Sequence, residues 1–152
     1  MSGSNNVVCP ISTKRINENV VRLVALLVIA VAVLGWLTGS RLVFLLLAFD
    51  FGLRAFSSGY YSPLRLAAQW IAQKSSLSVK LTDAAPKKFA AGIGLVFGFS
   101  IALALTLHWD AIAAVLSGVL VFCAFLESAL SFCVGCVVYS LLNRFLVLTS
   151  IK

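Results

Sequence analysis

Hydrophobic residues are gathered along the chain in four long runs that are separated by polar breaks. An α-helix needs roughly 20 apolar residues to cross the hydrocarbon core of a bilayer. We expect helices at about 20–38, 42–60, 89–107 and 111–143. The pattern therefore predicts an all-α fold, an integral membrane four-helix bundle that makes a single domain of residues 1–152.

The polar segment at 57–88, between the second and third runs, is too polar to cross a bilayer and predicts a loop. Ser62 followed by Pro63 is typical of a helix start, and polar residues then recur at every fourth position opposite apolar ones. We expect a short amphipathic helix at the membrane interface, with Trp70 at the depth of the headgroups.

The third run combines a predicted helix start with a stripe of small residues. Asp83 followed by Pro86 predicts a helix that the aspartate caps. Small residues then occur at every fourth position, at Ala90, Gly94, Gly98 and Ala102. In lipid such a stripe lets two helix backbones approach closely, so we interpret it as a packing seam, with a substrate path as the alternative.

Composition agrees with a lipid environment. The chain is 61% hydrophobic and 11% charged, with a mean hydropathy of +1.05, well beyond the roughly half-apolar usage of soluble domains. The net charge of +7 does not indicate nucleic-acid binding, because the cations flank apolar runs instead of lining a hydrophilic face. The first run lacks a small-x-small cleavage site and is expected to stay as a helix.

The cations are divided unequally between the two sides of the predicted bundle. Arg41 alone flanks one side. The other side carries Lys14, Arg15, Arg22, Arg65, Lys74, Lys80, Lys87, Lys88, Arg144 and Lys152. The positive-inside rule then predicts a multi-pass protein of the cytoplasmic (inner) membrane, with both termini and the loop at 57–88 in the cytoplasm.

Three ionisable residues interrupt the apolar runs, namely Asp50, Arg54 and Glu127. Each costs a few kcal/mol in lipid unless it is paired, so we expect all three to face the bundle interior. Asp50 and Arg54 are four residues apart, which predicts an ion pair within one helix, and Arg54 is also expected to reach Glu127. A buried polar clamp and a proton relay or ion site remain as alternatives.

The chain has four cysteines. Cys133 and Cys136 form a C-x-x-C, which is expected on one helical face near the cytoplasmic headgroups, and Cys9 lies on the same side. We expect these thiols to be redox-active, sulfur-carrying, metal-binding or inert, and Cys123 to be a small core residue. A tetrahedral metal site needs a fourth ligand, and the only histidine is predicted on the opposite side; the sequence contains no nucleotide, haem or flavin signature.

Several short motifs, in order, resemble a family of small bacterial membrane proteins, domain of unknown function 4395. The motifs are Cys9-Pro10, Arg15 to Asn19, Asp50-Phe51 with Arg54, Ser62-Pro63, Pro86 to Ala90, Glu127, and Phe132 to Cys136 with Tyr139. The resemblance implies four helices, and a link to sulfur chemistry because some members are encoded beside thioredoxin-like proteins and sulfurtransferases. It places the family's cysteine motifs on Cys9, Cys133 and Cys136 and its intramembrane polar motif on Asp50, Arg54 and Glu127. The position after Cys136 is often polar in the family, and here it is Val137.

Three functional hypotheses follow, and whether the protein is an enzyme stays open. The leading one is thiol-redox or sulfur-transfer chemistry at the cytoplasmic face, with Cys133 or Cys136 as the attacking thiolate and Cys9 as a third relay. The second is a small transporter for a proton or a sulfur-containing anion, which would require a homo-oligomer. The third is a scaffold that recruits a soluble sulfurtransferase or thioredoxin-like partner through the basic loop.

Overall fold

The computed structural model describes residues 15–57 and 60–150, which form six α-helices and two short strands. The elements are β1 (Arg15–Asn17), α1 (Glu18–Thr38), α2 (Arg41–Phe56), α3 (Pro63–Lys74), β2 (Leu81–Asp83), α4 (Ala85–Thr106), α5 (Asp110–Leu130) and α6 (Val134–Ser150). The all-α prediction is therefore confirmed, with a single pair of three-residue strands added among the described residues.

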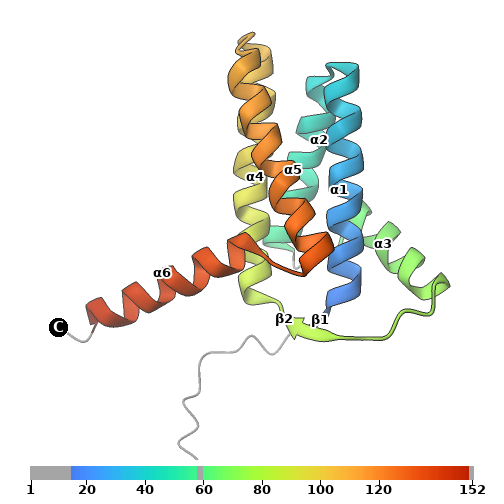
Figure 1. Ribbon diagram of the computed structural model, residues 1–152, viewed down its shortest axis with the longest axis vertical. Helices are drawn as coiled ribbons and strands as arrows, with labels where there is room; N and C mark the ends of the chain where they lie inside the picture. The colour runs from blue at the N-terminus through green and yellow to red at the C-terminus, as the bar shows by residue number, and fades with distance from the viewer. Residues whose placement is uncertain (1–14, 58–59, 151–152) are drawn as a thin grey trace, which may run out of the picture.

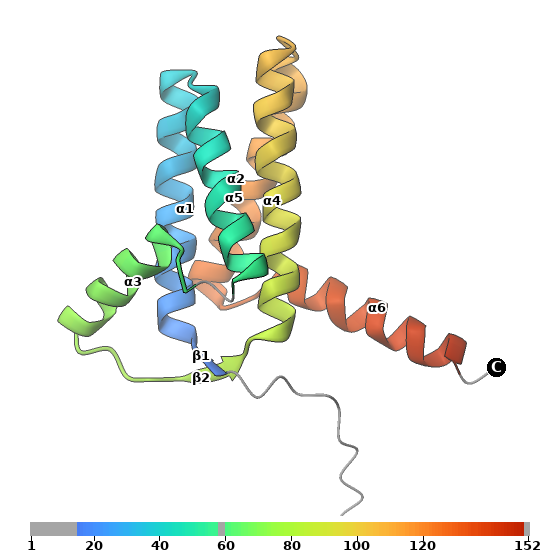
Figure 2. The same ribbon diagram turned by 180° about the vertical axis from the view of Figure 1, so that it is seen from behind.

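Helices α1, α2, α4 and α5 stand side by side, while α3 and α6 project sideways from one end of this group (Figures 1 and 2). The same end carries β1 and β2, and the short α1–α2 and α4–α5 connections lie at the other end. Among the described residues, α1, α4 and α5 are long and apolar enough to cross a membrane, whereas α2 has 16 residues.

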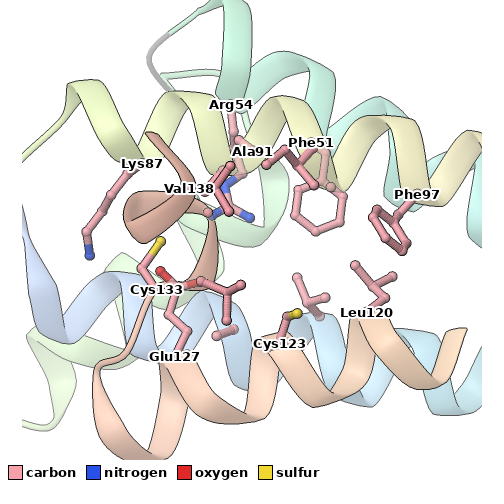
Figure 3. A pocket seen from close by; sticks show the side chains of 18 of the residues that line it. Phe51, Arg54, Lys87, Ala91, Phe97, Leu120, Cys123, Glu127, Cys133 and Val138 are labelled. Atoms are coloured by element: carbon pink, nitrogen blue, oxygen red, sulfur yellow. The ribbon is translucent and has the colours of Figure 1, made fainter. Parts of the chain in front are cut away.

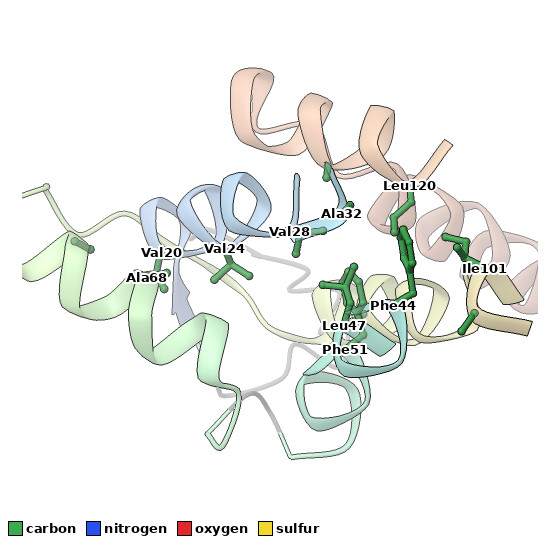
Figure 4. Packing of buried hydrophobic residues seen from close by; sticks show 14 residues of the cluster. Val20, Val24, Val28, Ala32, Phe44, Leu47, Phe51, Ala68, Ile101 and Leu120 are labelled. Carbon is green, nitrogen blue, oxygen red and sulfur yellow. The ribbon is translucent and has the colours of Figure 1, made fainter. Parts of the chain in front are cut away.

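The buried core consists mainly of small and medium-sized apolar side chains. On α1, Val20, Val24 and Val28 recur at every fourth position and form one buried stripe. Phe44 and Leu47 of α2 pack against the interior of the bundle (Figure 4). The outer surface carries many exposed large apolar side chains, among them Leu34, Leu37, Leu46, Phe49, Val96, Phe99, Val115 and Phe122. An outer surface with so many exposed apolar side chains is unusual for a soluble monomer and typical of contact with lipid.

The stripe of small residues on α4 forms the predicted packing seam. A Cβ atom added to Gly94 would lie 2.7 Å from ring atoms of Phe51, and one added to Gly98 would lie 3.0 Å from the Cβ of Ala48. Side chains at these two positions would push α2 away from α4. The glycines therefore permit the close contact of these two helices.

The chain before α4 differs from the prediction. Asp83 belongs to β2, which pairs antiparallel with β1 so that Arg15 lies opposite Asp83, and α4 follows after Ala84. The N-cap position of α4 is Ala84 and not Asp83 as predicted, because the backbone of this segment pairs with a strand some 65 residues earlier, a contact that local sequence does not reveal. The Asn17 side chain caps α1 by accepting the N–H of Asn19 at 3.1 Å.

The fourth hydrophobic run does not form one helix over 111–143. Helix α5 ends at Leu130, Ser131 adopts a left-handed conformation with φ of 54°, and α6 starts in a new direction (Figure 1). The guanidinium of Arg22, on α1, donates to the carbonyl oxygens of Ser128 and Ala129 at 2.8 and 3.3 Å. A distant cation thus satisfies carbonyl groups that the helix end leaves open.

Candidate functional site

Asp50 is almost fully buried, with 2% of its surface exposed, and it binds the start of α3. Its Oδ1 accepts a hydrogen bond from the Ser62 hydroxyl at 2.6 Å and from the N–H of Leu64 at 3.3 Å. Ser62 caps α3 in turn by accepting the N–H of Arg65 at 3.2 Å, as the sequence predicts. Asp50 therefore fixes α3 onto the bundle.

The predicted ion pair between Asp50 and Arg54 is wrong. No contact of 4 Å or less joins the Asp50 carboxylate to the Arg54 guanidinium, whereas Lys80 and Glu18 do form an ion pair, at 3.3 Å. Asp50 is engaged by α3 instead, and the Arg54 guanidinium carbon lies 5.3 Å from the centre of the Phe51 ring. The side chains of Asp50 and Arg54 thus have different surroundings, α3 for the first and the Phe51 ring for the second.

Arg54 lines a cavity of about 250 Å³ that is enclosed by parts of α1, α2, α4, α5 and α6 (Figure 3). Its other ionisable walls are Lys87 from the first turn of α4 and Glu127 from the last turn of α5. Cys133 lines the cavity as well. The structure therefore joins one residue of the predicted C-x-x-C to two of the three predicted intramembrane polar residues.

Most of the cavity wall is apolar. Phe51, Phe97 and Leu120 surround its inner part, and Gly94 of the packing seam contributes backbone surface (Figure 3). The thiol of Cys123 also faces this space and is half-buried, so it is a wall residue more than a core residue. The cavity thus has mostly apolar walls, and its ionisable side chains gather at one end.

The sulfur atoms of Cys133 and Cys136 are joined in a disulfide, with the two Cα atoms 5.1 Å apart. Cys133 immediately precedes α6, and its Sγ accepts the N–H of Cys136 at 3.2 Å. The C-x-x-C therefore occupies the beginning of a separate helix, and not the cytoplasmic end region of one long helix over 111–143 as the sequence predicted. Helix starts stabilise negative charge, including that of a thiolate.

The disulfide separates two spaces. Cys133 and Lys87 line the apolar cavity and also a groove of about 530 Å³ at the strand end of the molecule. Cys136 lines the groove together with Glu18 and Arg144, and it is not part of the cavity wall. A reagent in the groove thus meets both cysteines, and a ligand in the cavity meets Cys133 alone.

Lys87 is the site residue that the sequence analysis missed. It was counted among the cytoplasmic cations, and the available signals were its place in the Pro86 to Ala90 motif and its position in the first turn of an apolar helix. Cys9 lies outside the described residues. Within the described part of the chain, no group of three or more His, Cys, Asp and Glu side chains is arranged to hold a metal ion.

A family model described as a domain of unknown function (DUF4395) matches residues 16–144. No match was found among curated proteins or among solved structures. The matched range covers β1 to α6 up to Arg144, including the cavity and the disulfide.

Proposed function

The chain belongs to the domain of unknown function 4395 family, as its motifs predicted, and we propose that it is a multi-pass membrane protein that performs thiol–disulfide exchange at Cys133 and Cys136. The observation that carries this proposal is a paired C-x-x-C at the start of α6, with Cys136 facing a groove. Half-buried sulfurs in such a position remain within reach of a partner thiol.

The exchange proceeds in two displacements. A thiolate of a soluble dithiol attacks the Cys136 sulfur from the groove, the bond between the two cysteines breaks, and Cys133 leaves with the electron pair as a thiolate. The N–H of Cys136 that donates to the Cys133 sulfur stabilises this leaving group. The second cysteine thiolate of the partner then attacks the sulfur of the partner's first cysteine in the mixed disulfide and releases Cys136 as a thiolate. The partner leaves with a disulfide, and the C-x-x-C is left reduced.

Helix α2 is part of the membrane bundle in this proposal, which makes four crossing helices. At 1.5 Å per residue its 16 residues extend about 24 Å, slightly less than the hydrocarbon core, and side chains at its ends can bridge the difference. Leu42, Leu46 and Phe49 form an exposed apolar face on α2, which suits lipid contact.

Helix α3 is proposed to lie at the membrane interface, with both termini in the cytoplasm of a bacterial cell. Trp70 is exposed, and the Lys74 ammonium lies 5.1 Å from the centre of its ring, a combination that suits the headgroup region. Lys80 and the other cations near β1 and β2 support the same orientation, because Arg41 lies at the opposite end.

The proposed soluble partner is a thioredoxin-like or sulfurtransferase protein. The groove offers such a partner one carboxylate, from Glu18, and two cations, from Lys87 and Arg144. A dithiol protein that extends its active-site cysteine into this groove would reach Cys136.

Trapping of the mixed disulfide tests the proposal. In a Cys133→Ser variant, the Cys136 thiolate is expected to attack a thioredoxin-like protein that keeps only its attacking cysteine, activated as a mixed disulfide with thionitrobenzoate. Thionitrobenzoate leaves, and the adduct is stable because neither thiol that would resolve it is present; mass spectrometry of the detergent-purified chain detects it. Cys123→Ser serves as the matched control and should exchange like the wild type. Unchanged exchange in a Cys133→Ser, Cys136→Ser double variant would contradict the proposal.

A transport function is the second candidate, because Arg54, Lys87 and Glu127 share one cavity. In proteoliposomes it predicts flux of a proton or a sulfur-containing anion that Glu127→Gln abolishes and Cys133→Ser leaves intact. The opposite pattern, exchange that depends on the cysteines without any flux, would rule transport out.

A further inference from the structure

We infer that the cavity beside Cys133 binds a lipid-soluble two-electron carrier of the quinone class, and that this carrier reoxidises the Cys133–Cys136 dithiol. The inference rests on the proposed thiol–disulfide exchange. It adds to that exchange the identity of the electron acceptor that restores the disulfide.

The place of the cavity is the first argument. Val119 of α5 and Val138 of α6 line it, and each keeps 42% of its surface exposed, so the cavity reaches the outer surface of the helices. In the proposed membrane orientation that surface meets lipid. A ligand dissolved in the bilayer can therefore enter from the side, whereas the apolar wall disfavours a small hydrophilic anion.

The charged end of the cavity is the second argument. Arg54 and Lys87 provide hydrogen-bond donors and positive charge for a carbonyl oxygen that becomes negative on reduction, and Glu127 can carry a proton. An acyl chain of a lipid would fill the apolar part of the cavity but would offer no polar group to these three half-buried side chains. A quinone has an apolar tail, which suits the apolar walls, and a head whose carbonyl oxygens accept hydrogen bonds, which suits the charged end.

The position of Cys133 is the third argument. Its sulfur borders the cavity, while Cys136 borders the groove, so the pair connects a soluble thiol donor to a membrane-soluble acceptor. The two electrons that enter through Cys136 leave a thiolate on Cys133. That thiolate forms next to the proposed quinone head.

The step balances as follows. The Cys133 thiolate adds to a ring carbon of the quinone, and the Cys136 thiolate then attacks the Cys133 sulfur. The sulfur–carbon bond breaks, the disulfide forms again, and the electron pair stays on the ring. The hydroquinone gains two protons, equal in number to those lost by the two cysteine thiols, and Glu127 delivers one of them.

A single-turnover experiment separates the two half-reactions. The full chain is reduced in phospholipid vesicles, the reductant is removed, a short-tailed benzoquinone is added, and the thiol state is read by alkylation and mass spectrometry. We expect the disulfide to return in the wild type. In Arg54→Gln, which changes the cavity but not the groove, the return should be at least about tenfold slower while exchange with the soluble dithiol persists.

Two further variants make the result decisive. Leu120→Trp fills the cavity and should block reoxidation by the quinone; if it does not fold, Val119→Trp at the rim replaces it. Lys80→Gln removes a charge from the exposed surface and is the matched control. Equal quinone reoxidation in all variants would overturn the inference. The inference would also be overturned if the cavity retained phospholipid and quinone did not reoxidise the cysteines, while exchange with the soluble dithiol continued. That result would leave the proposed function intact.

Discussion

At the scale of single residues, burial decides which polar partners meet. Asp50 could bind Arg54 one turn along the same helix, but it binds Ser62 and the backbone of α3 instead. The hydroxyl and the amide both donate to Oδ1 of the buried carboxylate, whose Oδ2 has no hydrogen-bond partner among the described residues. Arg54 is thereby left to face the cavity and Glu127, which makes it available for a ligand.

Removal of the Ser62 hydroxyl should destabilise the protein. Ser62→Ala leaves the buried Asp50 carboxylate without its 2.6 Å donor and α3 without its cap, which should cost about 1–3 kcal/mol. Unfolding in a mild detergent with increasing denaturant measures this loss. Ser117→Ala is the matched control, because the buried Ser117 hydroxyl has no hydrogen-bond partner among the described residues and its removal should be close to neutral. Equal effects of the two changes would disprove the role given to Ser62.

At the scale of elements, the important event is the division of the fourth hydrophobic run into α5 and α6. The turn at Ser131 carries the C-x-x-C to the beginning of a helix, and Gly135 then allows α6 to press against α4. A Cβ atom added to Gly135 would lie 2.5 Å from the Cβ of Ala90 and 2.7 Å from its Cα. The glycine inside the C-x-x-C therefore holds the disulfide against the cavity.

Gly135→Ala should disturb this contact even though alanine is the better helix former. The obstacle is backbone of α4, which cannot move aside like a flexible side chain, so we expect α6 to shift and both cysteines to be alkylated faster after reduction. Gly92→Ala on α4 meets no atom within 4 Å and provides the control, with unchanged or improved stability. Alkylation rates that match in the two variants would show that the close approach has no such role.

At the scale of the whole molecule, polar function gathers at one end. The strands and the start of α6 lie at the end at which α3 and α6 leave the bundle (Figure 2). Residues of these segments and of the first turn of α4 line the groove, and Lys87 and Cys133 among them also line the charged end of the cavity. The opposite end has only the two short connections. In the proposed membrane orientation, exchange with soluble partners is therefore expected on one side alone.

Labelling of single cysteines tests this asymmetry in intact cells. In a chain whose own cysteines are replaced by serine, Trp109→Cys lies in the exposed α4–α5 connection and should react with a membrane-impermeant maleimide. Lys80→Cys, at the exposed strand end, should react only after the cells are opened. The reverse pattern would invert the proposed orientation, and labelling of both in intact cells would contradict the multi-pass topology.

The sequence by itself determined the helical class, the start of α3 and the family, and it predicted a lipid environment, because hydropathy, caps and short motifs are properties of neighbouring residues. It also singled out Arg54, Glu127 and Cys133, since charges and paired cysteines stand out within apolar runs. Only the tertiary structure decided that these three meet with Lys87 around one cavity while Asp50 binds α3. Such contacts join residues that are far apart in the chain, and they depend on how backbones pack at glycines and on where a helix ends, which no local pattern of residues records.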